Sequence, residues 1–435
     1  MWEIDGKYTN DLEFVKDYFG LKYLPMVRSL IDQDLYKYSM GQTYHHQFGS
    51  LKTTWDFKAR NVGEGTTHYS VYTDEDKKEI NNQLRAYAAL RFDEDELQYL
   101  NAKCPWIKQD YINFLRFWHP RLEDFQFTTN NKFGNGIMFF GVQEYIEYYE
   151  IPVLEIFAEV YYRNHYDYGE LLKGFKAETE KKIQKLKSQK YHLGTWSEFG
   201  ARRRLSFEAQ DWLIGRLAEE QLSGFIGTSN VLLAKKYGVT PVGTMAHEFF
   251  QCIQGGIPGI NPAYSNKFAL DAWVKEYGVW NGIALTDTLG TELFLRDFGK
   301  TYSTLFSGVR NDSGDPFKWA DRMIEHYRRV GVNAKEKTLL FSNSIDSIEL
   351  WDKLCRYVEG RAKPAFGIGT YWSGPQTINP LNIVAKVVLV NGGDVAKLSD
   401  DEGKCMCRNS AYIDYLRRTI NWRLDNEINT NYYID

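Results

Sequence analysis

The chain has 435 residues, with 53 lysines and arginines against 57 aspartates and glutamates, which gives a net charge of −4. This balance argues against a dedicated nucleic-acid binder, because such proteins carry a large cationic excess, although it leaves a local basic patch open. Hydrophobic residues make up 43% and charged residues 25% of the chain, which is typical of a folded globular protein and excludes disordered, collagen-like and coiled-coil architectures.

The cysteines and the apolar runs indicate a cytoplasmic enzyme without a membrane partner. The five cysteines are scattered and odd in number, so they imply no disulfide framework. Cys405 and Cys407 stand close together, but no second Cys or His cluster lies nearby, which disfavours a zinc site. The longest apolar runs, such as residues 382–390, fall well short of the roughly 20 residues that a membrane helix requires.

The first 150 residues predict a mixed α/β unit. Asp34 is a suitable cap for the first helix, and residues 53–59 alternate apolar and polar side chains with the period of a half-buried strand. Turn-rich residues 130–136 between two apolar segments predict a hairpin. We expect a helix over residues 35–48, a helical stretch from residue 75 through residue 118, and strands over residues 53–59, 123–129 and 136–149.

From residue 151 onward, short apolar runs end abruptly in polar residues and are separated by segments of helix length. Strands that alternate with helices form parallel sheets, and seven or eight of them over about 220 residues indicate closure into an α/β barrel. The predicted strands are residues 152–160, 195–203, 224–230, 241–248, 282–288, 305–315, 339–346 and 364–370. Residues 168–190 are expected to form a solvated amphipathic helix.

These patterns predict two domains. Residues 1–150 form the mixed α/β N-terminal domain, with residues 390–435 as a candidate addition to it, and residues 151–390 form the α/β barrel. Barrel enzymes build their active sites from the carboxyl ends of the strands and the loops that follow them. We therefore expect the functional residues on the polar tails of the predicted strands.

Two of these tails are suited to phosphate. Gly367, Gly369 and Thr370 follow the last predicted strand, where backbone amides freed by glycine can approach a phosphate closely, although an ordinary tight turn explains the glycines equally well. Residues 202–204 are three consecutive arginines, and alternate residues point in different directions. We expect Arg202 and Arg203 to face the site, because planar guanidinium groups suit phosphate or pyrophosphate oxygens, and we favour this over surface charge on the next helix.

Two other tails carry acids and a histidine. Arg310 suits a substrate carboxylate, while Asp312 suits sugar hydroxyls or Mg²⁺, and Asp315 also suits a helix cap. His247 is a candidate general acid/base, metal ligand or phosphoryl-accepting nucleophile, and spacing alone does not choose among these roles. For Tyr36, core packing is the simpler interpretation of the residue by itself.

Taken together, these motifs resemble those of nicotinate phosphoribosyltransferases, especially the bacterial form. The matching strings, in the family's order, are LIDQDLYKYSM, SEFGARRR, GTSNVLLAKKYG, VGTMAHEFFQ, LTDTLGTELFLRDF, VRNDSGDP, FSNSID and FGIGT, and the resemblance spans about residues 22–420. It implies an α/β fold, with an α+β N-terminal part plus an irregular parallel α/β barrel of the type II phosphoribosyltransferase kind. It also implies condensation of nicotinate with 5-phosphoribosyl-1-pyrophosphate to nicotinate mononucleotide and pyrophosphate, coupled to ATP hydrolysis, in NAD salvage.

The resemblance implies roles for individual residues. His247 matches the histidine that ATP phosphorylates and Asp312 an acid near the ribose, which makes both candidate catalytic residues. Positions at nicotinate are matched by Tyr36, Thr244 and Arg310, of which Tyr36 comes across a dimer interface in the family. Phosphate and pyrophosphate contacts are matched by Arg202, Arg203, Gly367, Gly369 and Thr370. The resemblance further implies Mg²⁺, ATP as a co-substrate and a homodimer with shared active sites, and assigns no protein ligand to the metal.

Other functions remain open at this point. A sister enzyme that uses nicotinamide or quinolinate is the nearest alternative, but a neutral amide needs no cationic partner and a dicarboxylate needs more cations than these motifs provide. A sugar-phosphate-binding barrel lyase would require a buried lysine on a strand tail, and none of the predicted strands ends in one. A non-catalytic scaffold is disfavoured because the charged motifs are intact.

Overall fold

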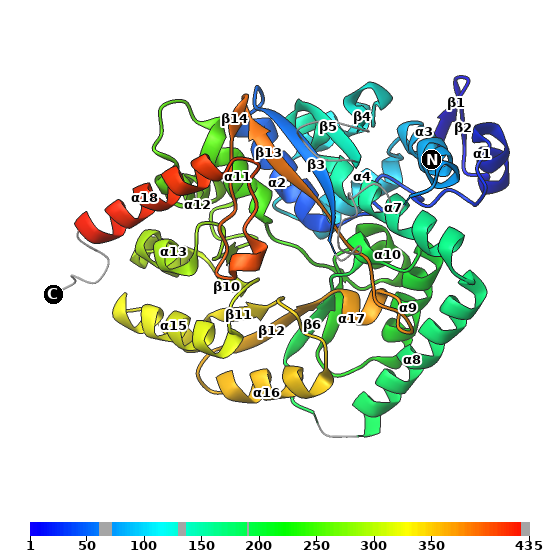
Figure 1. Ribbon diagram of the computed structural model, residues 1–435. Helices are drawn as coiled ribbons and strands as arrows, with labels where there is room; N and C mark the ends of the chain where they lie inside the picture. The colour runs from blue at the N-terminus through cyan, green and yellow to red at the C-terminus, as the bar shows by residue number, and fades with distance from the viewer. Residues whose placement is uncertain (61–71, 129–135, 189–190, 428–435) are drawn as a thin grey trace.

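Two large sheets organise the chain, as a computed structural model shows for residues 1–60, 72–128, 136–188 and 191–427 (Figure 1). One is a seven-stranded parallel sheet, and the other is a five-stranded antiparallel sheet that contains strands from both ends of the chain. A separate pair, β1 (Trp2–Ile4) and β2 (Lys7–Thr9), forms a small antiparallel ribbon. Among the described residues, no helix has both the length and the apolar content needed to cross a membrane.

The N-terminal part contains most of the predicted elements. Its helices are α1 (Leu12–Phe19), α2 (Leu35–Gln47), α3 (Asp74–Ala88), α4 (Glu94–Lys103), α5 (Gln109–Phe117), α6 (Gln143–Ile146) and α7 (Glu150–His165), with 3₁₀ turns η1 (Leu122–Asp124) and η2 (Glu147–Tyr149). Its strands are β3 (Lys52–Arg60), β4 (Phe125–Thr128) and β5 (Gly136–Val142). The predicted hairpin is confirmed by the antiparallel pairing of β4 with β5, while residues 129–135 of its turn lie outside the described residues.

Two predictions in this part are wrong in detail. Residues 143–149 form α6 and η2 instead of continuing a strand, and the Gln143 side chain donates to Glu147, a contact that helical spacing provides. Asp34 does precede α2, but its side chain makes no capping bond. The Asp34 carboxylate instead accepts a hydrogen bond from the Ser229 hydroxyl at 2.5 Å.

The antiparallel sheet joins the two ends of the chain. Its order is β14-β13-β3-β5-β4, in which β13 (Asn382–Val390) and β14 (Gly393–Asp394) come from the C-terminal part. β13 runs against β3 from Asn382 opposite Arg60 to Val390 opposite Thr53. β13 lies within residues 151–390, which the sequence analysis assigns to the barrel, but it pairs with β3 in the antiparallel sheet.

The parallel sheet has the order β8-β7-β6-β12-β11-β10-β9. Its strands are β6 (Thr195–Glu198), β7 (Phe225–Thr228), β8 (Thr240–Pro241), β9 (Ile283–Leu285), β10 (Gly308–Asn311), β11 (Thr338–Phe341) and β12 (Lys363–Ile368). The predicted α/β class is confirmed. The predicted closure into a full barrel does not occur within the described part of the chain, because no pairing joins β8 to β9, and the sheet is an open half barrel.

The first predicted barrel strand, residues 152–160, is wrong, because these residues belong to helix α7. The helix packs on α3 on one side and on β13 and the 3₁₀ turn η3 (Ala201–Arg203) on the other. Every residue from Glu150 to Val160 is consequently buried. A helix buried all round shows no 3.6-residue alternation of apolar and polar side chains, so its sequence is indistinguishable from a buried strand.

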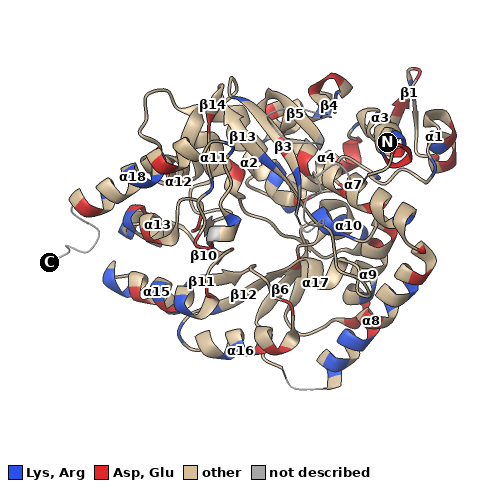
Figure 2. Ribbon diagram, in the orientation of Figure 1, with Lys and Arg blue, Asp and Glu red and all other residues tan. Residues whose placement is uncertain are grey.

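The rest of the chain contains the remaining helices, and Figure 2 marks where Lys, Arg, Asp and Glu lie along their ribbons. These helices are α8 (Tyr168–Ser188), α9 (Phe207–Glu220), α10 (Val231–Tyr237), α11 (His247–Gly256), α12 (Ser265–Tyr277), α13 (Thr291–Asp297), α14 (Lys300–Leu305), α15 (Pro316–Arg329), α16 (Ile348–Val358), α17 (Thr370–Ser373) and α18 (Ser410–Asn426), with η4 (Pro262–Tyr264), η5 (Ala334–Glu336) and η6 (Glu402–Lys404). As predicted, α8 buries one stripe, and Asp315 caps α15 by accepting from the amides of Phe317 and Lys318.

Candidate active site

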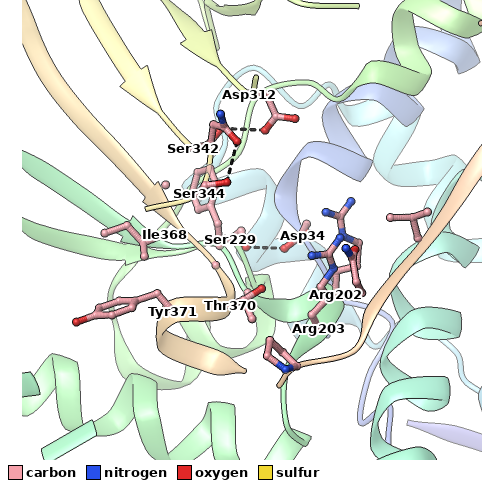
Figure 3. A pocket seen from close by; sticks show the side chains of 18 of the residues that line it. Asp34, Arg202, Arg203, Ser229, Asp312, Ser342, Ser344, Ile368, Thr370 and Tyr371 are labelled. Carbon is pink, nitrogen blue, oxygen red and sulfur yellow. Dashed lines mark hydrogen bonds between the residues drawn. The ribbon is translucent and has the colours of Figure 1, made fainter. Parts of the chain in front are cut away.

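A cavity of about 1130 Å³ opens at the carboxyl ends of the parallel strands, and Figure 3 shows part of its lining. The segments that follow β6, β7, β8, β10, β11 and β12 contribute to its wall, together with α2, α7 and the chain from β13 onward. The residues predicted for the site all line this one cavity, namely Tyr36, Arg202, Arg203, Thr244, His247, Arg310, Asp312, Gly367, Gly369 and Thr370. The structure therefore gathers residues from both sheets at one place.

His247 begins helix α11 and is 5% exposed. Its Nε2 lies 2.8 Å from Oδ1 of Asp287 and 3.6 Å from Oδ2 of Asp312. Burial, followed by the charge of Lys397, lowers the pKa of His247 to about 4 against the opposing effect of Asp287. The imidazole is therefore neutral at pH 7. Because the carboxylate of Asp287 accepts a hydrogen bond from Nε2–H, Nδ1 carries the lone pair.

Asp287 is the residue that sequence analysis missed at this point. Burial acts to raise the pKa of Asp287, but His247, Lys397 and a hydrogen bond from Ser313 hold it well below its usual range. The Ser313 hydroxyl donates to Oδ2 at 2.5 Å, and Lys397 Nζ lies 3.2 Å from the same oxygen. Asp287 follows β9 at the polar end of predicted strand 282–288, so the rule that selected the other strand tails applies to it as well.

Arg310 and Asp312 form a second polar group on β10 and its tail. The Arg310 guanidinium donates to the Ser342 hydroxyl at 2.9 Å, to the carbonyl of Met245 at 3.1 Å and to Asp312 at 3.0 Å. Burial acts to raise the pKa of Asp312, but Arg310 and its other cationic neighbours hold it well below its usual range. The Asp312 side chain keeps 24% of its surface exposed, so it offers oxygen atoms to the cavity.

The three consecutive arginines separate in space. Arg202 and Arg203 line the cavity, where Figure 3 shows them on the side opposite Ser342 and Asp312. Arg202 Nη1 lies 3.8 Å from the carboxylate of Glu150. Arg204 points away from the cavity, is fully buried and pairs with Asp32 at 2.7 Å.

Gly367 and Gly369 make room for the chain next to them. A Cβ at Gly367 would lie 2.5 Å from the ring of Phe199, and one at Gly369 would lie 2.9 Å from the Phe199 carbonyl oxygen. Phe199 itself lines the cavity, so these glycines bring the tail of β6 against the tail of β12. Thr370 then begins the short helix α17.

Tyr36 lines the cavity of its own chain from the first turn of α2. The next residue, Lys37, is fully buried and lies 2.7 Å from Glu150 and 2.5 Å from Glu248. Lys37 thereby ties the helix of Tyr36 to the start of α7 and to the residue that follows His247. Its charge compensates carboxylates that burial would otherwise destabilise.

The C-terminal segment supplies cations that the motifs did not reveal. Lys386 on β13 is 8% exposed and lines the cavity. Lys397 and Lys404 also line the cavity. Burial lowers the pKa of Lys386 to about 8, with further lowering by Arg202 and Lys397, while Glu150 acts in the opposite direction. The sequence did contain a signal for Lys386, which is a lysine inside the apolar run 382–390. A buried strand residue is rarely cationic unless a partner or a ligand compensates its charge.

Comparison with known proteins agrees with this geometry. The sequence model described as the nicotinate phosphoribosyltransferase (NAPRTase) family matches residues 195–423, and the model of the corresponding N-terminal domain matches residues 31–158. The chain belongs to the nicotinate phosphoribosyltransferase family. The family resemblance of the motifs is thereby confirmed.

Relatives within the family match nearly the whole chain. The nicotinate phosphoribosyltransferases of Neisseria gonorrhoeae and Acinetobacter baylyi are each 38% identical, over 90% and 92% of this chain and 97% of their own length. The crystal structure of nicotinate phosphoribosyltransferase from Porphyromonas gingivalis superimposes with a TM-score of 0.80 at 29% identity, covering 91% of this chain and 100% of the other. The one from Vibrio cholerae gives 0.78 at 30% identity, covering 91% and 94%.

Proposed function

We propose that this chain condenses nicotinate with 5-phosphoribosyl-1-pyrophosphate to nicotinate mononucleotide and pyrophosphate, coupled to hydrolysis of ATP to ADP and phosphate, in NAD salvage. The observation that carries the proposal is the gathering of the candidate nicotinate, ribose and phosphate residues in one cavity of a chain from this family. Arg310 would pair with the nicotinate carboxylate, and Tyr36 would pack on the pyridine ring.

In the proposed reaction, the bond from ribose C1 to pyrophosphate breaks and the pyridine nitrogen forms a bond to the same carbon. Pyrophosphate leaves with its charge neutralised by Arg202 and Arg203, while Asp312 stabilises the positive charge that develops on the ribose. The pyridine nitrogen carries no proton in its attacking form, so the step needs no general base. Positioning and electrostatics supply the acceleration.

The proposed phosphoryl transfer uses His247. The Nδ1 lone pair attacks the γ-phosphorus of ATP, the bond to the bridging oxygen breaks, and ADP leaves. Oδ1 of Asp287 accepts a hydrogen bond from the Nε2–H group at 2.8 Å and stabilises the positive ring that forms. Hydrolysis of the phosphohistidine then releases phosphate. The phosphoryl group adds roughly −1.5 to −2 charges near the pyrophosphate site, as other protein phosphates do. His247 thus couples ATP to the site without acting on the glycosidic bond.

Mg²⁺ fits the donor set at this point. His247, Asp287 and Asp312 each offer one ligand atom, and these atoms lie within 4.8 Å of one another. Asp287 already accepts from His247 and Ser313, and Oδ1 of Asp312 accepts from Arg310 and Ser342. Oδ2 of Asp312 is therefore the better ligand for a hard cation that keeps several waters. The ion would neutralise phosphate charge when bound.

Two alternatives bear on the test. A lyase was disfavoured because no predicted strand ends in lysine, yet Lys386 of β13 lies in the cavity with a lowered pKa of about 8. The family and the cationic wall favour phosphoribosyl transfer over a lyase. The second alternative is a sister enzyme that uses nicotinamide, so the test compares nicotinamide with nicotinate as the acceptor.

A homodimer with shared active sites stays a prediction, and so does a cytoplasmic location.

The test incubates the purified protein with Mg²⁺ and 5-phosphoribosyl-1-pyrophosphate, offers nicotinate or nicotinamide with and without ATP, and measures mononucleotides and ADP by chromatography. We expect nicotinate mononucleotide that rises with ATP and is accompanied by ADP. Product from nicotinamide alone would indicate the sister activity, and no product from either would refute the proposal. We expect His247→Ala to abolish the stimulation by ATP and to leave slow transfer, whereas complete loss of transfer in the folded variant would contradict this role.

A further inference from the structure

Glu198 is the last residue of β6 and is fully buried behind the cavity wall. It does not line the cavity, so it cannot touch a substrate there. Its carboxylate accepts hydrogen bonds from the amide of Gly200 at 2.6 Å and from the hydroxyl of Thr228 at 2.6 Å. The Gln210 amide donates to both of its oxygens, at 3.1 and 3.2 Å. A buried carboxylate with this many donors fixes the groups around it.

The donors belong to segments that build the cationic side of the cavity. Gly200 starts the turn that carries Arg202 and Arg203, and Thr228 precedes Ser229, which lines the cavity. The fit around Glu198 is tight, because a Cβ at Gly200 would lie 2.5 Å from its Oε1 and 1.4 Å from the hydroxyl of Ser373. We call residues 200–204 the arginine turn, and Glu198 fixes its start against the tails of β7 and β12.

The other end of the turn is fixed by a connected network. Arg204 donates to Asp32 at 2.7 and 3.2 Å and to the Gln210 side-chain oxygen at 3.1 Å. Since that oxygen accepts from Arg204, the NH₂ group of Gln210 must face Glu198. The orientation of Gln210 is therefore not free to reverse. The arginine turn is held at Gly200 by Glu198 and at Arg204 by Asp32, and the two anchors meet through Gln210.

We propose that Glu198 is a positioning residue that sets the affinity of the cavity for pyrophosphate by fixing Arg202 and Arg203. The proposal rests on the proposed function, in which these arginines bind the leaving group. Replacement by glutamine keeps the size but replaces one acceptor oxygen with an NH₂ donor. An NH₂ at the position of Oε1 faces the amide of Gly200, and one at the position of Oε2 faces the fixed NH₂ of Gln210. Either orientation removes a hydrogen bond from the network, so the turn is held less firmly. Small displacements of charged groups in a site cost large factors in binding.

The test compares Glu198→Gln with a matched control, Glu276→Gln. Glu276 is also buried, and it accepts from Gln42 at 2.8 Å and from His46 at 2.7 Å, while Lys108 lies 2.8 Å away. Neither Glu276 nor these partners line the cavity. Titration calorimetry with inorganic pyrophosphate measures Kd, steady-state kinetics measures KM for nicotinate, and thermal unfolding reports folding. We expect the pyrophosphate Kd to rise at least about tenfold in Glu198→Gln and to stay unchanged in Glu276→Gln.

The KM for nicotinate is expected to change less than about twofold in Glu198→Gln, since Arg310 is held by other contacts. A merely structural role would lower the unfolding temperature of both variants and leave the pyrophosphate Kd at the wild-type value, which would overturn the proposal. If Glu198→Gln does not fold, Thr228→Val removes one donor and must still weaken pyrophosphate binding. Wild-type protein that binds pyrophosphate but forms no mononucleotide would refute the proposed function. The pyrophosphate Kd of the two variants would still test whether Glu198 positions the arginines.

Discussion

Lys386 is expected to make substrate binding dependent on pH in the range just above neutrality. Burial lowers its pKa to about 8, and it faces the cavity beside other cations. The cationic form attracts a phosphate or pyrophosphate anion, and the neutral form does not. Lys386 is charged below its pKa, so the affinity for the anion is lost as the pH rises through about 8.

The size of the effect follows from the pKa. The charged fraction of Lys386 is about 0.9 at pH 7 and about 0.1 at pH 9 for a group that titrates near pH 8. If binding requires the charged form, the affinity for 5-phosphoribosyl-1-pyrophosphate falls about tenfold over this interval, which is about 1.4 kcal/mol. Binding at pH 8 is also expected to take up about half a proton, because the bound anion raises the pKa of Lys386.

Calorimetric titration at pH 7, 8 and 9, in buffers of different ionisation enthalpy, measures both quantities. Lys386→Arg is the matched variant, because arginine stays charged throughout this range and experiences the same ionisation of the ligand. The wild-type affinity relative to this variant should fall with pH, and Lys386→Met should bind weakly at every pH. Parallel curves for wild type and Lys386→Arg, without proton uptake, would refute the reasoning.

Three further outcomes follow from the site. Gly200→Ala places a Cβ 1.4 Å from the Ser373 hydroxyl, so thermal unfolding should show destabilisation and transferase activity should fall; wild-type values for both would contradict the packing. Arg204→Met leaves the Asp32 carboxylate buried without its partner, and urea unfolding should show a loss of about 3–5 kcal/mol, whereas less than about 1 kcal/mol would mean that the pair contributes little. His247 stays neutral above its pKa of about 4, so its phosphorylation by ATP should show no acid limb near pH 6.5, which rapid-quench measurements check.

The candidate site was largely predictable because it lies on strand tails. Parallel strands end at one edge of a sheet, so polar residues that close separate apolar runs converge without any long-range information. This is why His247, Arg310 and Gly369 could be named from their positions alone. Asp287 obeys the same rule, and its role is visible only once the structure places it 2.8 Å from His247.

The remaining features depend on contacts between distant parts of the chain. Residues 152–160 lack helical periodicity because α7 is buried on every side, and burial on every side is a property of the assembled protein. Lys386 reaches the cavity because β13 pairs with β3, and no local pattern indicates that pairing. Asp34 has a residue type suited to capping, but Ser229 offers its side chain a buried partner instead.

The pairing of β13 with β3 has a consequence for biosynthesis. During translation, β3 leaves the ribosome roughly 320 residues before β13, an interval of roughly 15–65 s at usual elongation rates. Throughout this time one edge of β3 lacks its partner, and an open strand edge is a template for aggregation. The same late segment brings Lys386, Lys397 and Lys404. A nascent chain therefore gains the cover for its sheet and the last cations of its cavity together, and shorter translation products have neither.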